Sequence, residues 1–475
     1  MTTPRSLLVA VLAVAAFSTP AAAGELATTC TGVSEYGSVC RVPEAAASNG
    51  SAACRRDAPV ADEQCATPLN RPVSERAITD HEGSWVHRAL AMQYELGSSL
   101  GFRDAMWVGT HNSTNSASEP FTPSQGDHNQ QLSLTDQLRI DVRSLELDLH
   151  WFQSPRTQGA RAVVACHARG ADQMHAGCSN ERLFVDRMPE IAQWLEANPD
   201  EVILLYLEDH LEGLPGHDSA AAILESAIGP RIYRASTTGS CRELPGTGLT
   251  RDAVRAAGKQ VVLVASGCGQ GSAWRNLVFD WRAIEDEARP VDYSPSCTTD
   301  FSRSHQAAQL IRYYEDSTVL AATTWPTGVS SMDDGLTPAT TAAMARCGVE
   351  LFGFDQLLPD DGRLPALVWS YAEGEPSAGD ACAVRKSNGR WEGRSCDGRL
   401  RYACRTEGGG WVIAGASGAA KHGADRCARK DGVFEAPRSG PENEALSEIA
   451  GRESVWVGIR PAPKPAAKSK AKRRG

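Results

Sequence analysis

Short apolar runs rich in β-branched residues alternate with longer runs of helical periodicity between residues 85 and 365. Seven of the short runs have the length and composition of strands. They are Met106 to Thr110, Arg143 to Trp151, Ala162 to His167, Glu201 to Glu208, Gln260 to Ala265, Val319 to Thr324 and Val349 to Asp355. Segments such as Arg182 to Asn198 place apolar residues at helical spacing between them. This alternation predicts an α/β fold: a single parallel TIM-type (β/α) barrel whose eighth strand is not visible, with a doubly wound sheet as the alternative.

The beginning of the chain has the features of an export signal. Arg5 precedes an apolar run, Leu7 to Phe17, which is followed by small residues up to Ala23. This order is typical of a secretory signal peptide over residues 1–23, so we expect a secreted protein, extracellular or periplasmic. All 14 cysteines follow that segment, which suits disulfide bonds in an exported protein.

Three further segments flank the predicted barrel of residues 85–365. Residues 24–84 are polar and contain four cysteines, so we expect a small stapled segment with little core of its own. From residue 366 helix-like runs stop and Trp, Gly and Cys become frequent, which predicts a separate disulfide-stapled module over residues 366–460. Residues 461–475 form a basic tail that we expect to be disordered.

The charge of the chain excludes one class of partner. The formal net charge is -10, whereas binding to a nucleic acid backbone requires a basic face. Nucleic acid is therefore not expected as a partner. The sequence leaves the oligomeric state open.

Residues that can bind a cation or move protons stand at the ends of several predicted strands. Side chains alternate along Arg143 to Trp151, so Glu146 and Asp148 point into one space, the mouth of the predicted barrel. Two buried carboxylates there would repel each other unless a cation lay between them. Asn112 and Glu208, at the ends of other predicted strands, add further oxygens. A set of oxygen ligands suits Ca²⁺ better than Zn²⁺.

These motifs together resemble the X-region of phosphoinositide-specific phospholipase C, in its calcium-dependent branch. The residues that carry the resemblance are Thr110-His111-Asn112-Ser113, Arg143 to Asp148, Cys166-His167 and Val202 to His210. In that branch a His-Asn pair, a Glu-x-Asp strand, a second His and a later Glu build the site. The metal-independent bacterial branch has an Arg on the second strand where Asp148 stands here, which favours calcium.

The resemblance implies a phosphodiesterase that acts on a phosphatidylinositol-like lipid, or on another phosphodiester, at a membrane surface. In the family a neighbouring hydroxyl of the substrate attacks phosphorus, and Ca²⁺ activates that hydroxyl and neutralises the phosphoryl oxygens. Glu146 or Asp148 is the candidate general base. His111 would donate to the phosphoryl oxygen, and His167 would protonate the leaving alcohol. Asp355 could orient His111, although an Asp that merely leads a helix is an equal alternative.

Two other functions remain open. Glycerophosphodiesterases and sphingomyelinase D relatives also use His, Glu-x-Asp and His, but they typically carry other residues after the first His. A catalytically idle surface-binding protein is the second alternative, and the complete set of costly carboxylates argues against it. Four further histidines are expected to be solvated or packing residues: His128, His150, His175 and His210.

The C-terminal module resembles a C-type lectin-like domain whose halves stand in reversed order. The run Trp369 to Cys404 resembles the second half and the run Trp411 to Ile459 the first, which implies a circular permutation. The family pattern then implies disulfide bonds Cys382–Cys396 and Cys404–Cys427; pairing of Cys347 with Cys382 is the alternative. The family's sugar-binding motifs are degraded here to Glu375-Pro376-Ser377 and Trp391-Glu392-Gly393, so docking to a glycan or a surface stays open.

Overall fold

The computed structural model describes residues 73, 75–116, 118, 129–167, 182–280, 310–315, 336–349, 351–376 and 382–459, together with the backbone of strands β1 (Thr29–Ser34), β2 (Gly37–Arg41) and β9 (Ile284–Glu287). The predicted signal peptide, the predicted strand Val319 to Thr324, the basic tail, His128 and His175 lie outside the described residues. In the described part of the chain, no helix combines the length and apolar character needed to cross a membrane.

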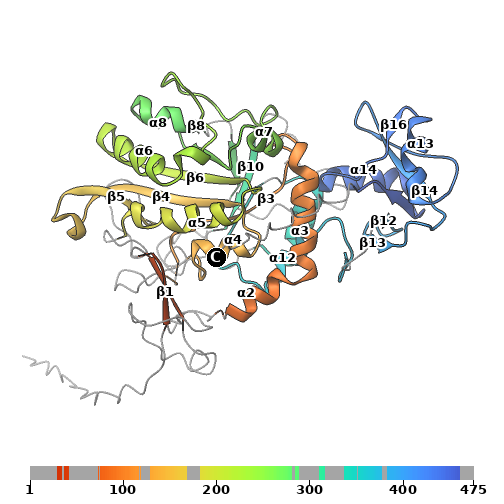
Figure 1. Cartoon of the computed structure of the whole chain (residues 1–475), viewed down its shortest axis with the longest axis horizontal. Helices are drawn as coiled ribbons and strands as arrows, with labels where there is room; N and C mark the ends of the chain where they lie inside the picture. The colour runs from red at the N-terminus through yellow and green to blue at the C-terminus, as the bar shows by residue number, and fades with distance from the viewer. Residues whose placement is uncertain are drawn as a thin grey trace, which may run out of the picture.

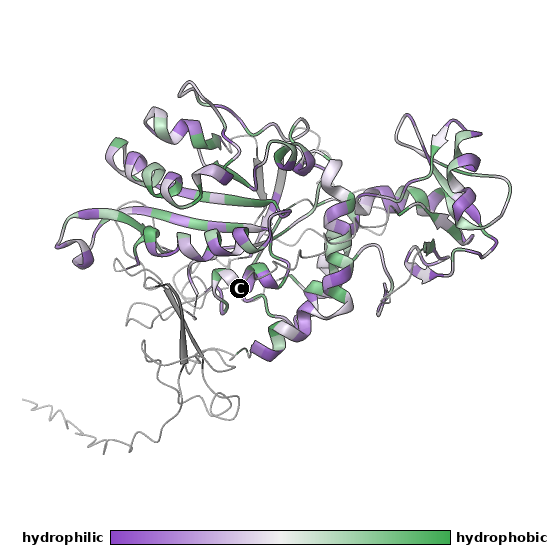
Figure 2. Ribbon diagram, in the orientation of Figure 1, coloured by the Kyte–Doolittle hydropathy of each residue, from purple (hydrophilic) through white to green (hydrophobic). Residues whose placement is uncertain are grey.

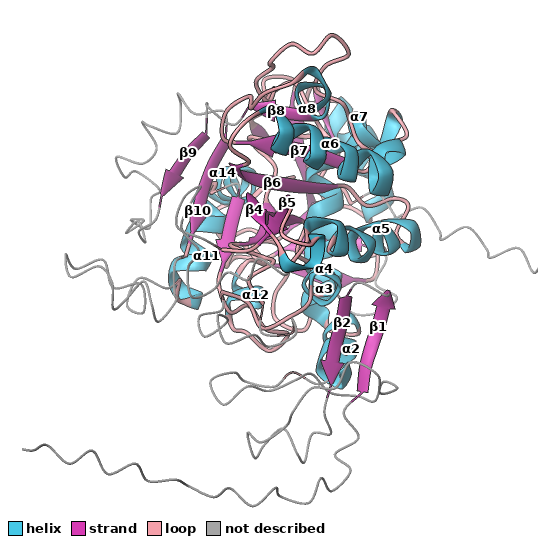
Figure 3. Cartoon of the chain, turned by 90° about the vertical axis from the view of Figure 1, so that its left-hand side faces the viewer, coloured by secondary structure: helices cyan, strands magenta, loops and turns pink. Residues whose placement is uncertain are grey.

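A parallel sheet of eight strands, in the order β8-β7-β6-β4-β3-β11-β10-β9, forms the centre of the larger domain (Figures 1 and 3). Every neighbouring pair along this path is parallel. The other strands are β3 (Trp107–Thr110), β4 (Ser144–Gln153), β6 (Ile203–His210), β7 (Val261–Ala265), β8 (Val278–Asp280), β10 (Leu310–Tyr314) and β11 (Leu351–Phe354). The sheet curls into a half-barrel of the TIM type, which confirms the predicted α/β class.

Helices cover the outer face of this sheet. They are α2 (Glu75–Glu82), α3 (Trp85–Leu96), α4 (Leu134–Arg139), α5 (Met188–Ala197), α6 (Leu214–Ile228), α7 (Arg251–Ala256), α8 (Ser272–Leu277), α11 (Pro338–Cys347) and α12 (Arg363–Ala366). Strand β4 alternates hydrophilic and hydrophobic residues (Figure 2). Its leucines, Leu145, Leu147 and Leu149, are fully buried in the core, and this fixes the opposite direction for Glu146 and Asp148.

The prediction that Ala162 to His167 is a barrel strand was wrong. Strand β5 (Arg161–Ala165) pairs antiparallel with the last five residues of β4, from Leu149↔Ala165 to Gln153↔Arg161. Strand β4 is ten residues long, so it extends past β3 and leaves its edge open to β5. Consequently β6 is the direct neighbour of β4 in the sheet, and Asp148 lies opposite Glu208.

The C-terminal module contains a second sheet, of order β13-β12-β17-β14-β15 with β16 paired to β14. Its elements are β12 (Cys382–Arg385), β13 (Trp391–Arg394), β14 (Arg401–Thr406), β15 (Trp411–Ile413), α13 (Gly423–Ala428), β16 (Gly432–Val433), α14 (Gly440–Ala450) and β17 (Val455–Val457). The last strand, β17, lies between β12 and β14, so the two halves of the module interleave. Disulfide bonds join Cys382 to Cys396 and Cys404 to Cys427, which confirms both predicted pairs and excludes the alternative for Cys382.

The module packs tightly against the barrel through α14, which faces it in Figure 1. Gln93, on α3 of the barrel, accepts from the Ser370 N–H at 3.0 Å and donates to the Leu367 carbonyl at 3.2 Å. A Cβ atom at Gly440 would lie 2.1 Å from the Ala345 carbonyl oxygen on α11, so only glycine permits this approach. Barrel and module residues belong to one continuous hydrophobic core.

Candidate active site

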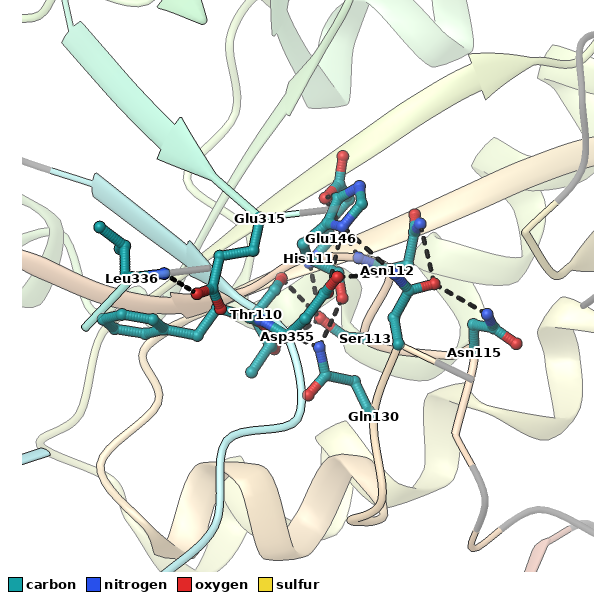
Figure 4. A network of polar contacts seen from close by, with 12 residues as sticks. Thr110, His111, Asn112, Ser113, Asn115, Gln130, Glu146, Glu315, Leu336 and Asp355 are labelled. Carbon is teal, nitrogen blue, oxygen red and sulfur yellow. Dashed lines mark hydrogen bonds and ion pairs between the residues drawn. The ribbon is translucent and has the colours of Figure 1, made fainter. Parts of the chain in front are cut away.

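The sequence-predicted residues of the barrel mouth come from four neighbouring strands. His111 follows β3, Glu146 and Asp148 lie on β4, Glu208 lies on β6, and Asp355 follows β11. Parallel strands place their carboxyl ends at one edge of the sheet, which explains the convergence of residues distant in sequence (Figure 4).

Three carboxylates form the centre of this site. One oxygen from each of Glu146, Asp148 and Glu208 lies within 4.8 Å of the other two. Glu146 and Asp148 are buried, with 4% and 1% exposure. Burial, together with the charges of Glu208 and Glu146, raises the pKa of Asp148 well above its ordinary value. Burial acts in the same direction on Glu208, but the hydrogen bond and charge of His210, a hydrogen bond from Asp148 and the charge of His111 together outweigh it and lower the pKa of Glu208 to about 2.

Asn112 joins the turn after β3 to this cluster. Its φ of 46° is left-handed, a conformation that Asn tolerates better than most residues. Its backbone N–H donates to Glu146 Oε2 at 3.2 Å, and the neighbouring Ser113 Oγ accepts from the Glu146 N–H at 2.9 Å. One end of the Asn112 side-chain amide lies 2.9 Å from both carboxylate oxygens of Asp148. The turn therefore places an amide group at the carboxylate cluster.

His111 and Asp355 form a buried pair beside the carboxylates. His111 Nδ1 lies 3.1 Å from Asp355 Oδ1, and His111 Nε2 lies 3.9 Å from Glu146 Oε2. Burial disfavours the imidazolium, but the charges of Asp355 and Glu146 prevail and raise the pKa of His111 to about 9. Asp355 thus contacts His111 directly, as the prediction that it orients this histidine requires.

Glu315, at the end of β10, fixes the backbone of this pair. Its carboxylate accepts from the Asp355 N–H at 2.7 Å and from the Leu336 N–H at 2.5 Å (Figure 4). Arg363 donates to Glu315 Oε2 at 2.5 Å and to the Asp355 carbonyl at 2.9 Å. Both the N–H and the carbonyl of Asp355 are therefore held by hydrogen bonds, to Glu315 and from Arg363 respectively.

Arg312, on β10, is a member of the site that sequence reasoning missed. Its Nη1 donates to Glu146 Oε1 at 2.9 Å, and its guanidinium lies 4.6 Å from the Tyr206 ring centre and 4.7 Å from that of Tyr314. The sequence comparison expected an acid, Asp148, in place of an Arg on the second strand, and the structure brings a guanidinium to the cluster from another strand, β10. The signal in the sequence was the alternation that puts Arg312 and Tyr314 on one face of a short strand.

His167 does not lie on a barrel strand, because it follows β5; the N–H of the preceding Cys166 donates to the Asp148 carbonyl at 3.2 Å. Burial, with the charges of His210 and His167, lowers the pKa of His150 to about 3. The His150 ring is fully buried and stacks on His210 at 4.6 Å, which agrees with a packing role for His150. His210 differs from the expectation, because its Nε2 lies 3.2 Å from Glu208 Oε1 and so contacts the carboxylate cluster.

Comparison with known proteins defines the family. The model of the Rv2075c PI-PLC-like domain matches residues 66–361, where PI-PLC denotes phosphatidylinositol-specific phospholipase C. The protein Rv2075c of Mycobacterium tuberculosis is 41% identical over 426 residues, which cover 86% of each chain. The chain therefore belongs to the family of Rv2075c PI-PLC-like domains. The match begins before the predicted boundary at residue 85 and includes helix α2.

More distant proteins share the class name. A PI-PLC X domain-containing protein of Arabidopsis thaliana, At5g67130, is 27% identical over 120 residues, 24% of this chain and 25% of that protein. The phospholipase C structure from Listeria monocytogenes aligns with 59% of this chain and 97% of its own, at 13% identity and a TM-score of 0.38. A calcium-dependent phosphoinositol-specific phospholipase C from Pseudomonas aligns with 57% of this chain and 93% of its own, at 13% identity and a TM-score of 0.32.

Proposed function

We propose that this chain is a secreted, calcium-dependent phosphodiesterase of the phospholipase C type, acting on a phosphatidylinositol-like lipid. The observation that carries the proposal is the cluster of Glu146, Asp148 and Glu208, the first two of them buried, beside the His111–Asp355 pair. Family membership supports the reaction class. The signal-like start of the chain and the disulfide bonds support export.

The side chains present fit a hard divalent cation. Three carboxylates and the Asn112 amide offer oxygen donors, the ligands that Ca²⁺ prefers. Arg312 pairs with Glu146, and the pKa of Asp148 stays raised despite the Arg312 charge, so further positive charge would stabilise the ionised form of Asp148. A bound calcium ion would supply it, would lower the pKa of an attacking hydroxyl and would neutralise phosphoryl oxygens.

The protein's own groups then have separable roles. The His111 imidazolium, held by Asp355, donates a proton or hydrogen bond to the phosphoryl oxygen as negative charge builds there. Both oxygens of Glu146 already accept hydrogen bonds, from Arg312 and from the Asn112 N–H. We therefore assign the general base to Asp148, which accepts the proton of the attacking hydroxyl. We assign protonation of the leaving alcohol to His167.

The C-terminal module is better suited to covering the barrel than to binding sugar. Glu375, in the degraded motif, accepts from the Gly393 N–H at 3.2 Å. Glu392 pairs with Lys386 at 3.4 Å and with Arg394 at 2.6 Å. These internal contacts engage Oε2 of each carboxylate, an atom that a lectin-like site would offer to calcium and sugar. We propose that the module stabilises the barrel through their shared core.

The decisive test is hydrolysis of a panel of substrates with and without a chelator. Phosphatidylinositol, a glycosylated phosphatidylinositol, phosphatidylcholine and a glycerophosphodiester would be offered to the full chain, and products followed by ³¹P NMR. We expect a cyclic phosphate from an inositol lipid, loss of turnover in EGTA and recovery with Ca²⁺. Full activity in EGTA would exclude the metal assignment. Turnover of the glycerophosphodiester alone, without a cyclic intermediate, would favour the glycerophosphodiesterase alternative.

A further inference from the structure

Asn129 contacts both halves of the candidate site, although no motif in the sequence points to it. Its side chain is fully buried. Asn129 Nδ2 donates to Asp355 Oδ2 at 3.0 Å, and Asn129 Oδ1 accepts from Asn112 Nδ2 at 3.1 Å and from Asn115 Nδ2 at 2.8 Å. One amide thus connects the carboxylate that orients His111 with the candidate calcium ligand Asn112.

The nitrogen of a side-chain amide donates hydrogen bonds and its oxygen accepts them, so the orientation of Asn129 determines the orientation of Asn112. An ionised Asp355 can only accept hydrogen bonds, so Asn129 must turn its nitrogen toward Asp355. Its oxygen then faces the side-chain nitrogen of Asn112. Asn112 must in turn point its own oxygen at Asp148, 2.9 Å from both carboxylate oxygens. Oxygens that close need positive charge between them, from a proton or a metal ion.

Rotating the Asn112 amide by 180° would relieve the close approach of its oxygen to Asp148, but it would create another contact between two oxygens. The Asn112 nitrogen would then donate to Asp148, and the Asn112 oxygen could accept from His111 Nε2 at 3.2 Å. However, that oxygen would also lie 3.1 Å from Asn129 Oδ1, so two amide oxygens would face each other. Turning Asn129 as well would put its oxygen 3.0 Å from Asp355 Oδ2. If Asp355 is ionised, Asn129 must donate to it, and the facing amides of Asn129 and Asn112 then avoid a contact between two oxygens only when the Asn112 oxygen points at Asp148. That orientation requires a positive charge between Asn112 and Asp148.

We propose that Asn129 is a positioning residue that holds the Asn112 side-chain oxygen toward the calcium ion, an inference that rests on the proposed calcium dependence. A ligand held in its binding orientation does not have to reorganise when the ion arrives, which raises affinity. Partners that orient metal ligands typically contribute about 10- to 100-fold in metal affinity. Asn129 therefore links calcium binding to the same carboxylate, Asp355, that orients His111.

The test is the affinity of the full chain for Ca²⁺, measured by calorimetry and by the calcium-induced shift in melting temperature. Asn129→Ala should weaken calcium binding by about 10- to 100-fold. The matched control is Asn115→Ala, which removes a buried Asn that also donates to Asn129 Oδ1, and it should change the affinity by no more than a few-fold. Equal affinity of wild type and Asn129→Ala would overturn the inference.

A second variant keeps the test valid if Asn129→Ala folds poorly. Asn129→Asp retains an oxygen that accepts from Asn112, and its protonated oxygen can donate to Asp355. We expect its calcium affinity to stay near that of wild type, whereas Asn129→Leu, which has no acceptor, should lose it. Equal weakening in Asn129→Asp and Asn129→Leu would show that the acceptor is not what matters. Failure of wild type itself to bind Ca²⁺ would instead count against the proposed function.

Discussion

Two buried aspartates, Asp141 before strand β4 and Asp148 within it, show contrasting ways of holding a negative charge. Asp141 precedes β4 and is 5% exposed; Asp148 lies near the mouth and is 1% exposed. Burial disfavours the ionised form of Asp141, but hydrogen bonds from His81 and His87 lower its pKa. Burial and two neighbouring carboxylates raise the pKa of Asp148. The two aspartates are similarly buried, so the groups around each of them decide whether its pKa is lowered or raised.

The charge of Asp141 is balanced by groups of the protein itself, whereas the carboxylates around Asp148 require a bound cation. Each oxygen of Asp141 lies 2.8 Å from a ring nitrogen, of His81 on one side and His87 on the other. That cluster also brings three donor atoms together, as a metal site would, but its charge is already balanced by hydrogen bonds. At the mouth, like charges are held together by the fold, which is costly unless a cation completes the site. We therefore expect function at the carboxyl ends of the strands and stability at the opposite face.

Replacement of Asp148 should give the largest effect and the sharpest contrast. We expect Asp148→Asn to lower kcat/KM by about 10³-fold or more, because the cation's charge stabilisation of the transition state is lost. In EGTA the variant should be at least as stable as wild type, because a carboxyl whose ionisation the fold disfavours has been replaced by a neutral group. Lipid hydrolysis and chemical unfolding measure the two quantities. Retained activity, or a clear loss of stability in EGTA, would contradict this view of the mouth.

The histidines should give the next largest effect. His111→Ala and His167→Ala should each lower kcat by about 10²-fold or more, the usual scale for a lost acid–base group. A substrate with a very acidic leaving group should partly rescue His167→Ala but not His111→Ala. The matched control is His87→Ala, which also removes a histidine from a buried aspartate, but at the opposite face. It should lower the melting temperature and leave kcat unchanged. Near-normal activity of His111→Ala or His167→Ala would refute that residue's role.

The sequence predicted those parts of the fold that have a strong local pattern. Strands β3, β4, β6, β7 and β11 are apolar runs, and their convergence follows from parallel pairing. The run Ala162 to His167 has the same period as a barrel strand, since alternation does not distinguish a parallel partner from an antiparallel one. Strand β10 was missed because Arg312 interrupts a short apolar run. The buried guanidinium is stabilised by a hydrogen bond to Glu146 and by cation–π contacts with the rings of Tyr206 and Tyr314.

The carboxylates of the site could be predicted from the sequence, whereas the residues that hold the site in place, such as Asn129 and Glu315, could not. Glu146 and Asp148 share a strand face, and that can be read from spacing alone. Asn129 lies in a polar loop and meets Asp355 across 226 positions of sequence. Nothing in a single sequence marks such a contact, because its value comes from the direction of an amide and from three-dimensional packing. Glu315 is missed for the same reason.

Replacement of Asp141 should have a smaller effect, on stability alone. Asp141→Asn keeps the side-chain size and tolerates the left-handed φ of 72°, so the change mainly removes the charge. We expect a loss of about 2 kcal/mol in the free energy of unfolding, because His81 and His87 lose a shared acceptor. Calcium affinity and kcat per folded molecule should not change. A large loss of calcium affinity would show that the two aspartates are coupled rather than independent.

The smallest predicted effect is an exchange of protons on calcium binding. The raised pKa of Asp148 means that this carboxyl holds a proton over part of the range in which other aspartates are ionised. A cation must displace that proton, so calcium affinity should fall as pH falls, by up to about tenfold per unit if one proton is released. Calorimetry in two buffers of different ionisation enthalpy measures the number released. Asp141→Asn is the control and should release the same number, since the pKa of Asp141 is lowered and that group is already ionised. Calcium binding without proton release would mean that Asp148 is ionised before the cation arrives, and that the mouth, like the opposite face, already balances its own charge.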